Sequence, residues 1–437
     1  MQYNSRMFLG SLAGVVLLAI GPFALQAAVE QVSPVGGETV RLLPDEQIKI
    51  MAMPTYAERL AALKADLDKP HDSRCYGKNR DKKWRVSKPL VLRWRATEGE
   101  KGPWLVKIGK QPDLSDARDF WISARTPKSR SEKGGVRFKW TVPFANLEIG
   151  RTYYWKIWSN VKCPTWGCPS TIDAACPCGK GPKAHSSGIA SFVTDGQPPR
   201  WIAIEGRTSN IRDLGGWKTR DGRRVRQGML FRGQGLNDNS VSGVRKGRSR
   251  LMVEDVEYFT KTLGIKTDLD LRSKVEIADL SESPLGPGVA FIPRSSPAYK
   301  GIFSSSKGEN DLKSRGKQIM AENFRVFCDE KNYPIYFHCI GGADRTGSLA
   351  YVLNGILGVD RHDLETDWES TFYPDNLPEL RKEYTGPEYW CGENHFNDGF
   401  SQYGDAGTSW NDRIELYLLD CGITKEEIAK FRSIMLE

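Results

Sequence analysis

The sequence contains one cysteine and one arginine at a spacing that can support covalent phosphate chemistry. Cys339 and Arg345 are separated by five residues, between a strand-like run and a helix-like run. A glycine-bearing loop in that position can turn successive backbone N–H groups inward, with the positive end of the helix behind them, and a phosphate dianion fits such a nest. The residues expected to line the nest are Ile340, Gly341, Gly342 and Ala343.

Each reactive side chain of this segment has an expected role. Arg345 can hold two phosphoryl oxygens with its planar fork, a geometry that Lys cannot copy. The field of the loop amides and the arginine favours the thiolate of Cys339 at neutral pH, so Cys339 is the expected nucleophile and the reaction would pass through a phosphocysteine. We expect Thr346 to hydrogen-bond the thiolate and His338 to order the loop from behind.

The leaving oxygen requires a proton donor, and two carboxylates are candidates. Asp344 lies inside the loop and is the expected general acid. In the alternative, Asp344 pairs with Arg345 or a neighbouring arginine, and an upstream residue such as Asp311 supplies the proton. The spacing alone leaves both alternatives open.

The loop resembles the active-site loop of protein tyrosine and dual-specificity phosphatases. Its narrower form, HCxxGxDRTG, is similar to that of a bacterial family of secreted tyrosine and phosphoinositide phosphatases, in which the loop aspartate is the acid. Four further stretches fit this family, namely 210–216 (NIRDLGG), 230–233 (LFRG), 268–273 (DLDLRS) and 417–424 (YLLDCGIT). The resemblance covers most of residues 200–437. It implies a phosphatase domain with a central sheet flanked by helices and no metal or other cofactor.

Three positions refine what the resemblance implies. Ala343 stands where many members have Lys, which weakens a phosphoinositide assignment and leaves phosphotyrosine, or a small phosphate ester, ahead. The family places Arg212 and Arg272 near the pocket, which makes both candidates for substrate binding. Buried ion pairs with Asp213 and Asp270 are the equal alternative.

The pattern after residue 200 supports an α/β domain independently of the loop. Strands are expected at residues 265–271 and 335–339, and helices at residues 315–327 and 346–357. A Pro- and Gly-containing linker at residues 195–200 separates this domain from the part of the chain before it.

The preceding part, residues 28–197, alternates apolar and polar residues with period two, which predicts an all-β sandwich. Eight of the thirteen tryptophans fall between Trp84 and Trp166, as a thin core would require. Residues 147–155 (LEIGRTYYW) resemble a turn of fibronectin type III modules. A sugar-binding platform at Trp121 or Trp158 is the alternative use of the aromatic residues. We assign a first strand at residues 32–43 and a helix at residues 54–67 to the same domain.

The N-terminal segment and the cysteine content bear on the location of the protein and on its redox chemistry. Residues 1–27 read as a cleavable signal peptide, with a retained anchor as the alternative, so the protein is expected to be exported to the periplasm or outside the cell, with no membrane span after cleavage. Nine cysteines then favour disulfides, especially in the insert 163–178, and a zinc site there is the alternative. Cys328 is expected to be a buried thiol rather than a partner of Cys339, and Cys391 and Cys421 are a possible bridge.

Charge and motifs together limit the function. The net charge of +9 favours anionic partners, but Lys and Arg are spread along the chain, which argues against dedicated nucleic-acid binding. The sequence therefore predicts a cysteine-dependent phosphatase acting on a phosphorylated protein, most of all on phosphotyrosine. The alternatives are the same chemistry on an inositol phosphate or phosphoinositide, and a non-catalytic extracellular binding module. No pattern in the sequence indicates an oligomeric state.

Overall fold

The computed structural model describes residues 28–67, 87–161, 185–238, 248–277, 280–305, 315–373 and 392–437. The predicted signal peptide, the cysteine-rich insert, Cys391 and Asp311 lie outside the described residues. Within those ranges no helix has the length and apolar character needed to cross a membrane.

The N-terminal part is a sandwich of two sheets, as the period-two pattern predicted. One sheet has the order β1-β3-β7-β6 and the other β2-β9-β8-β4-β5. Their strands are β1 (Val29–Ser33), β2 (Glu38–Val40), β3 (Val91–Ala96), β4 (Trp104–Gly109), β5 (Arg118–Ile122), β6 (Lys128–Glu132), β7 (Gly135–Thr141), β8 (Thr152–Trp158) and β9 (Ala190–Thr194). The single strand expected at residues 32–43 is thus two short strands, β1 and β2, one in each sheet. The fibronectin type remains a prediction.

Tryptophan rings fill the space between the two sheets. Trp94 of β3 lies edge-on to Trp104 of β4, with ring centroids 5.3 Å apart, and stacks on Phe138 of β7 at 5.5 Å. All three belong to one buried cluster. On β3 the buried residues alternate with half-buried ones, which is the pattern that the sequence showed. Trp121, by contrast, is 38% exposed, so core packing does not account for it.

The C-terminal part is built on a six-stranded sheet with the order β10-β11-β12-β15-β13-β14. Its strands are β10 (Arg200–Trp201), β11 (Arg212–Asp213), β12 (Leu230–Gly233), β13 (Thr267–Asp270), β14 (Ala290–Pro293) and β15 (Ile335–His338). The neighbours β12, β15, β13 and β14 are parallel, and β10 and β11 extend the sheet as antiparallel strands. The predicted α/β domain is therefore confirmed.

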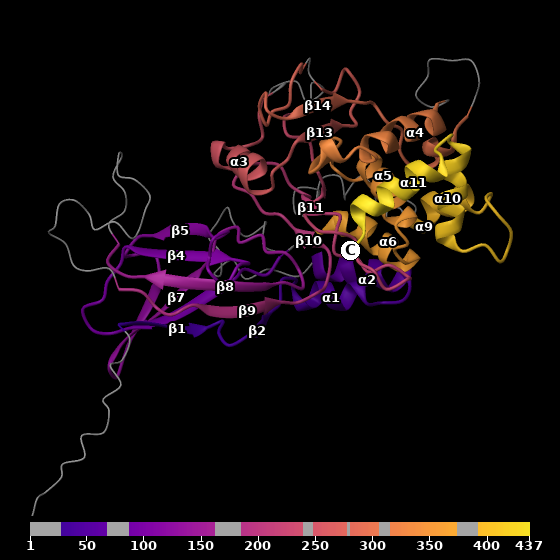
Figure 1. Ribbon diagram of the computed structural model, residues 1–437. Helices are drawn as coiled ribbons and strands as arrows, with labels where there is room; N and C mark the ends of the chain where they lie inside the picture. Colours follow the sequence, from indigo (N-terminus) through magenta and orange to yellow (C-terminus); the bar gives the residue numbers. More distant parts are fainter. Residues whose placement is uncertain are drawn as a thin grey trace, which may run out of the picture.

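Helices cover both faces of this sheet (Figure 1). They are α3 (Val253–Glu257) with the π-helix η3 (Tyr258–Thr262), η4 (Tyr299–Phe303), α4 (Gly316–Phe327), η5 (Glu330–Asn332), α5 (Asp344–Ile356), α6 (Arg361–Glu369), η6 (Ser370–Phe372), α9 (Gly392–Phe400), α10 (Trp410–Asp420) and α11 (Lys425–Met435). The alternation of β15 separates two cores, because Ile335 and Phe337 join the cluster of α4, α5, α10 and α11, whereas Tyr336 joins Phe259 of η3 on the other face.

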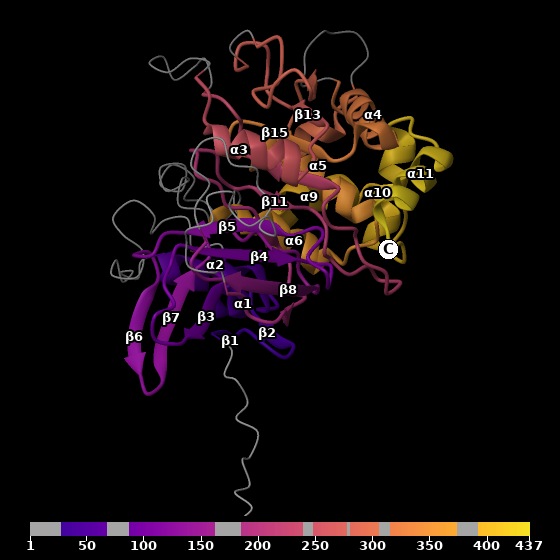
Figure 2. The ribbon, with the colours of Figure 1, turned by 60° about the vertical axis from the view of Figure 1, so that its left-hand side comes forward.

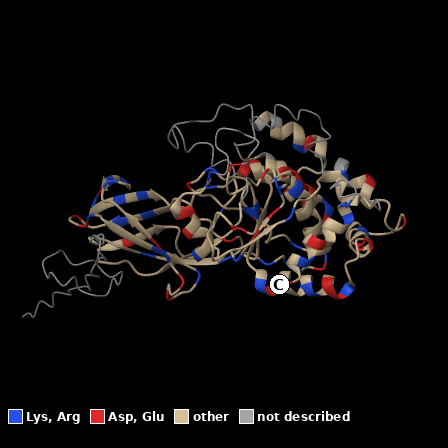
Figure 3. Ribbon diagram, turned by 90° about the horizontal axis from the view of Figure 1, so that it is seen from above, with Lys and Arg blue, Asp and Glu red and all other residues tan. Residues whose placement is uncertain are grey.

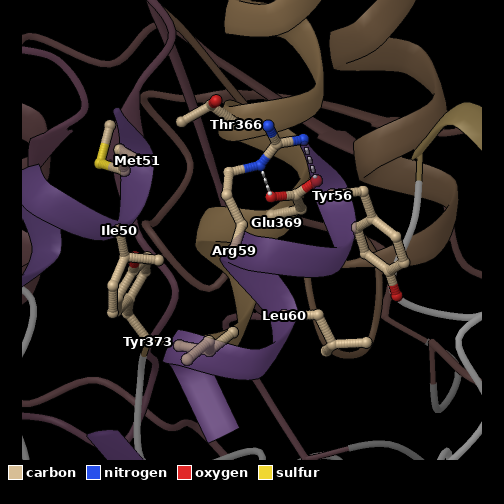
Figure 4. Close-up of a pocket in the computed structure, with 9 residues that line it drawn as sticks. Ile50, Met51, Tyr56, Arg59, Leu60, Thr366, Glu369 and Tyr373 are labelled. Carbon is tan, nitrogen blue, oxygen red and sulfur yellow. Dashed lines mark hydrogen bonds and ion pairs between the residues drawn. The ribbon is translucent and has the colours of Figure 1, made fainter. Parts of the chain in front are cut away.

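The domain assignment of the first helices was wrong. The helix expected at residues 54–67 forms as α2 (Tyr56–Leu67), preceded by α1 (Asp45–Met51), but both pack on the C-terminal domain. Ile50 and Leu63 join its main core, in which Trp368 of α6 is also buried. Figure 4 shows the buried Arg59 of α2 joined to Glu369 of α6, with Nε–Oε2 at 2.7 Å and Nη2–Oε1 at 2.9 Å. The apolar face of α2 and the cation Arg59 therefore pack against α6 and its surroundings rather than against the sandwich.

The sandwich and the C-terminal domain are also joined by two paired amide contacts. Gln227 bonds both the N–H and the C=O of Ile149, each at 2.9 Å, and Asn146 does the same for Ala203 at 2.8 and 2.9 Å. Arg200 adds a bond to the carbonyl of Leu147. Positive and negative side chains are interspersed over both parts (Figure 3), so no single element gathers the positive charge.

Replacing Arg59 tests the packing of α2 on α6. Arg59→Met should lower the free energy of unfolding by about 3 kcal/mol, because Glu369 would stay buried without its cation. Urea unfolding of the full chain, followed by fluorescence, measures the change. The matched control is Arg41→Met, whose partner Asp45 lies at 2.9 Å but on the surface, where a change near zero is expected. Equal effects of the two substitutions would contradict the assignment.

Candidate active site

Cys339 lies at the end of β15, in the turn that leads into α5. The side chain is buried, with 1% of its surface exposed, and the loop continues through Gly342 to the first residue of α5, Asp344. Gly342 has φ +67°, and a Cβ there would lie 2.4 Å from the backbone of Gly233. Only glycine allows this turn and this approach to β12. The sequence-predicted strand, loop and helix are therefore in place.

Three consecutive carbonyls of the loop are held from outside. Gly235 N–H donates to Ile340 O at 3.2 Å, Asn210 Nδ2 to Gly341 O at 3.1 Å, and Arg232 Nη2 to Gly342 O at 2.9 Å. In a trans peptide the C=O and the following N–H point in opposite directions. The N–H groups of residues 341–343 therefore point away from these supports, and none has a backbone acceptor among the described residues. This arrangement is the one that an amide nest requires.

Asp367 of α6 anchors the arginines behind the loop. Its Oδ2 lies 2.7 Å from Arg232 Nη1 and its Oδ1 lies 2.9 Å from Arg212 Nε. Burial would raise the pKa of Asp367, but the two guanidinium groups lower it below its usual value. Burial and the neighbouring Arg212 lower the pKa of Arg232 to about 9. The structure thus places Arg212 in a buried ion pair, although its partner is Asp367, since Asp213 pairs with Arg200 at 2.9 Å.

Arg272 lies in a second buried network beside the loop. Its Nη2 and Nε bond Asp270, and Nη2 also donates to Asn237 Oδ1 at 2.7 Å. His338 lies between two carboxylates, with Nε2 2.9 Å from Asp268 and Nδ1 3.8 Å from Asp270. Burial would lower the pKa of His338, but Asp270 and Asp268 raise it overall. Arg272 therefore takes the ion-pair arrangement, and His338 lies behind the loop.

Arg345 has a partner that the sequence analysis missed. Its Nη1 and Nη2 donate to the two carboxylate oxygens of Glu276, at 2.7 and 3.0 Å. Glu276 Oε2 also accepts Ser273 N–H at 2.7 Å, and Ser273 Oγ accepts Glu276 N–H at 3.4 Å. This is the reciprocal pattern of an S-x-x-E capping box. The spacing from Ser273 to Glu276, directly after the DLDLRS stretch, was the signal that could have located Glu276.

The two remaining predicted site residues differ in exposure. Asp344 is exposed at the start of α5 and accepts a hydrogen bond from the hydroxyl of Tyr299, the second residue that the sequence analysis missed. Tyr299 is held by its own N–H, which donates to Ser348 Oγ at 2.9 Å, and by its ring, which lies 5.7 Å from that of Trp368. Thr346 is fully buried, and its hydroxyl has no hydrogen-bond partner in the described part of the chain.

The other described cysteines are free thiols. Cys328 is buried and bonds the carbonyl of Phe324, so it does not pair with Cys339, and Cys421 is half-buried and free. Burial raises the pKa of Cys328 and that of Cys421 to about 12. Among the described residues, no group of three or more His, Cys, Asp or Glu side chains is placed to hold a metal ion.

The Glu276–Arg345 pair gives a pH-dependent prediction. Burial opposes ionisation of Glu276, but the bonds from Arg345 lower its pKa from 4.5 to about 2. A depressed folded pKa stabilises the fold above the unfolded value, and this stability is lost as pH falls towards the folded value. The free energy of unfolding of the wild type should exceed that of Glu276→Gln by about 2 kcal/mol at pH 7. This difference should shrink below about pH 4.5.

Unfolding midpoints in urea at pH 7, 5 and 3 measure this difference. Glu257→Gln is the control, because Glu257 pairs with Lys261 at 2.7 Å but both side chains are more than half exposed. A difference between wild type and Glu276→Gln that stays constant from pH 7 to 3 would show that the pair does not stabilise the folded state.

A known family and a curated protein resemble parts of this chain. The sequence signature of the Tyrosine phosphatase family matches residues 204–437, more than half of the chain. A Cupriavidus necator protein, named as a candidate tyrosine-protein phosphatase, is 30% identical over 193 residues, which cover 38% of this chain and 64% of that protein. The chain thus spans slightly less than two thirds of this curated relative.

Among solved structures, the core catalytic domain of the PP-IP phosphatase SIW14 from S. cerevisiae, in complex with citrate, aligns over 31% of this chain and 83% of that chain. The identity is 13% and the TM-score 0.20. The match over residues 204–437 includes the cysteine loop, the arginines behind it and the C-terminal helices. The chain belongs to the tyrosine phosphatase family.

Proposed function

We propose that this protein is a cysteine-dependent phosphatase that hydrolyses phosphomonoesters. The observation that carries the proposal is the loop from Cys339 to Arg345. Its carbonyls at residues 340–342 are held from behind, while the N–H groups of residues 341–343 have no backbone acceptor in the part of the chain that the structure describes. A phosphate bound there would meet the buried Cys339 on one side and the Arg345 guanidinium on another.

The reaction would take two steps. The Cys339 thiolate attacks phosphorus, the bond between phosphorus and the ester oxygen breaks, and Asp344 gives its proton to that oxygen. Water then attacks the phosphocysteine, the ionised Asp344 accepts the water proton, and the S–P bond breaks to release phosphate. Tyr299 orients Asp344 through its hydroxyl, and the hydroxyl of Thr346 is available to the thiolate.

The ion pair with Glu276 leaves Arg345 with N–H groups that can bind phosphate. A guanidinium has five N–H donors, and Glu276 uses one on each Nη. The N–H of Nε and one hydrogen on each Nη remain, which is enough for a two-point contact with phosphoryl oxygens. Glu276 therefore fixes the plane of the guanidinium before substrate arrives.

Phosphotyrosine in a protein is the proposed substrate. Ala343 adds no charge where a polyanionic headgroup would require one. Both arginines of the predicted substrate-binding set, Arg212 and Arg272, are committed to buried carboxylates instead of lining the mouth. One phosphate, held by one arginine and the loop amides, therefore suits the site better than several.

The action is proposed to take place outside the cytoplasm, with the sandwich as a fibronectin-like spacer or substrate-presenting module. The support is the apolar stretch 7–25 followed by Ala27 and Ala28. Mass spectrometry of the protein recovered from the periplasm or medium should find a chain that begins near Ala28. Recovery of the full-length chain in the membrane fraction would favour the retained anchor instead.

The nucleophile is tested by phosphate release in EDTA from a phosphotyrosine peptide, a phosphoserine peptide and inositol phosphates. Cys339→Ser should lower kcat/KM by about 10⁴-fold or more, because the thiolate attack is lost. Cys421→Ser, at a half-buried thiol remote in sequence from the loop, should keep full activity. If inositol phosphates react faster than phosphotyrosine, the substrate assignment fails while the chemistry stands. If no ester reacts, the binding-module hypothesis replaces the proposal.

The general acid is tested by comparing leaving groups. Asp344→Asn should lower kcat about 10²- to 10³-fold on the phosphotyrosine peptide, whose leaving oxygen needs a proton, and much less on 4-nitrophenyl phosphate. Asp311→Asn is the matched comparison. If Asp311→Asn shows the leaving-group dependence and Asp344→Asn does not, the acid lies upstream.

A further inference from the structure

A cavity of about 260 Å³ lies between the sandwich and the C-terminal domain, away from the cysteine loop. Strand β5 and its neighbour β4 form the sandwich side, on the side that faces α3 in Figures 1 and 2, and the π-helix η3 supplies the other wall. Single turns of π-helix occur frequently at functional sites.

Arg118 of β5 brings an unneutralised charge to this cavity. Its Nη1 donates to the carbonyls of Phe144 and Ala145, at 3.2 and 3.1 Å. Its Nε and Nη2 have no acceptor, and its guanidinium has no carboxylate partner, within the described ranges. The guanidinium carbon lies 5.0 Å from the ring centroid of Phe120 and 5.0 Å from that of Tyr258. Two rings, one from each domain, thus hold this cation in place.

Two tyrosines, each with a hydroxyl group, also line this cavity. Tyr153 Oη accepts the N–H of Glu148 at 2.9 Å, so its own hydrogen is still to be donated. Burial raises the pKa of Tyr153 to about 12, which keeps that hydrogen in place at neutral pH. Tyr258 lines the cavity from η3, and its hydroxyl makes no hydrogen bond to any residue that the structure describes. The cavity therefore has hydrogen-bond donors from both domains.

Two other cations around the cavity are paired with carboxylates. Lys110 Nζ pairs with Glu148 at 2.7 Å, and Arg200 pairs with Asp213 at 2.9 Å. Asp116 uses its carboxylate to accept the N–H groups of Lys110 and Gln111. Arg118 has no carboxylate partner among the described residues, and a negative ligand would supply one.

We propose that this cavity binds a small oxyanion, a carboxylate or phosphate group on a compact apolar body, through Arg118, Tyr153 and Tyr258. The guanidinium would give the charged contact and the two hydroxyls would each give a neutral one. The apolar body would lie against Phe120, Ile108 and Leu263, which also line the cavity. Because Tyr258 belongs to one domain and Arg118 to the other, the bound anion joins the two.

Calorimetric titration of the full chain with benzoate and with phenylphosphonate tests the site. The titrations use chains that carry Arg345→Met, so that the proposed phosphatase pocket does not contribute to the measured binding. Failure of the proposed function would be seen separately, as a lack of phosphatase activity in the chain without this substitution. Arg118→Met should weaken binding about tenfold or more, and Tyr153→Phe and Tyr258→Phe about three- to tenfold each. Arg130→Met, at an exposed arginine of β6, should leave binding unchanged.

The outcomes separate the ligand classes. Binding of benzoate alone supports a carboxylate, binding of phenylphosphonate alone supports a phosphate, and binding of both supports the general oxyanion site. The two Tyr→Phe variants keep the rings in place, so they test the donors even if Arg118→Met unfolds. Absence of saturable binding by both probes, or binding that all three variants leave unchanged, overturns the proposal.

Discussion

The carboxylate of Asp367 fixes Arg232, one of the three groups that hold the carbonyls of the Cys339 loop. It holds Arg232 and Arg212 at once, and Arg232 in turn holds the carbonyl of Gly342. All of these groups are buried, so loss of Asp367 would leave two buried guanidinium groups without this carboxylate. The loop amides can face a ligand only because their carbonyls are engaged behind them. The charged groups that support the loop therefore belong to residues outside it.

The same helix connects the loop to the start of the chain. Asp367 and Glu369 both lie on α6, two residues apart, and Glu369 binds Arg59 of α2. The order of contacts runs from α2 to α6, from α6 to Arg232, and from Arg232 to the loop. Strands β3 to β9 of the sandwich lie between α2 and α6 in sequence, but the sandwich does not contribute to this series of contacts. Its contacts with the C-terminal domain are separate and include the amide contacts at Asn146 and Gln227.

The sequence predicted the parts of the site that are contiguous. Strand, loop and helix from residue 335 to residue 356 follow one another, so spacing and periodicity were sufficient to locate Cys339 and Arg345. The supports come from residues far away in the chain. Glu276 is 69 residues from Arg345, and Arg232 is 135 residues from Asp367. No local pattern specifies which carboxylate meets which arginine, as the pairing of Arg212 with Asp367 rather than Asp213 shows.

The position of α1 and α2 has a consequence for biosynthesis. Glu369, the partner of Arg59, lies 310 residues further along the chain and is therefore synthesised later. At about 5–20 residues per second, roughly 15–60 s of translation separates the two. During that interval the apolar face of α2 has no partner, although the sandwich between them is already complete and can fold. The nascent chain is therefore expected to need a holding chaperone until α6 emerges, and a fragment that starts at residue 200 would leave the α6 surface uncovered.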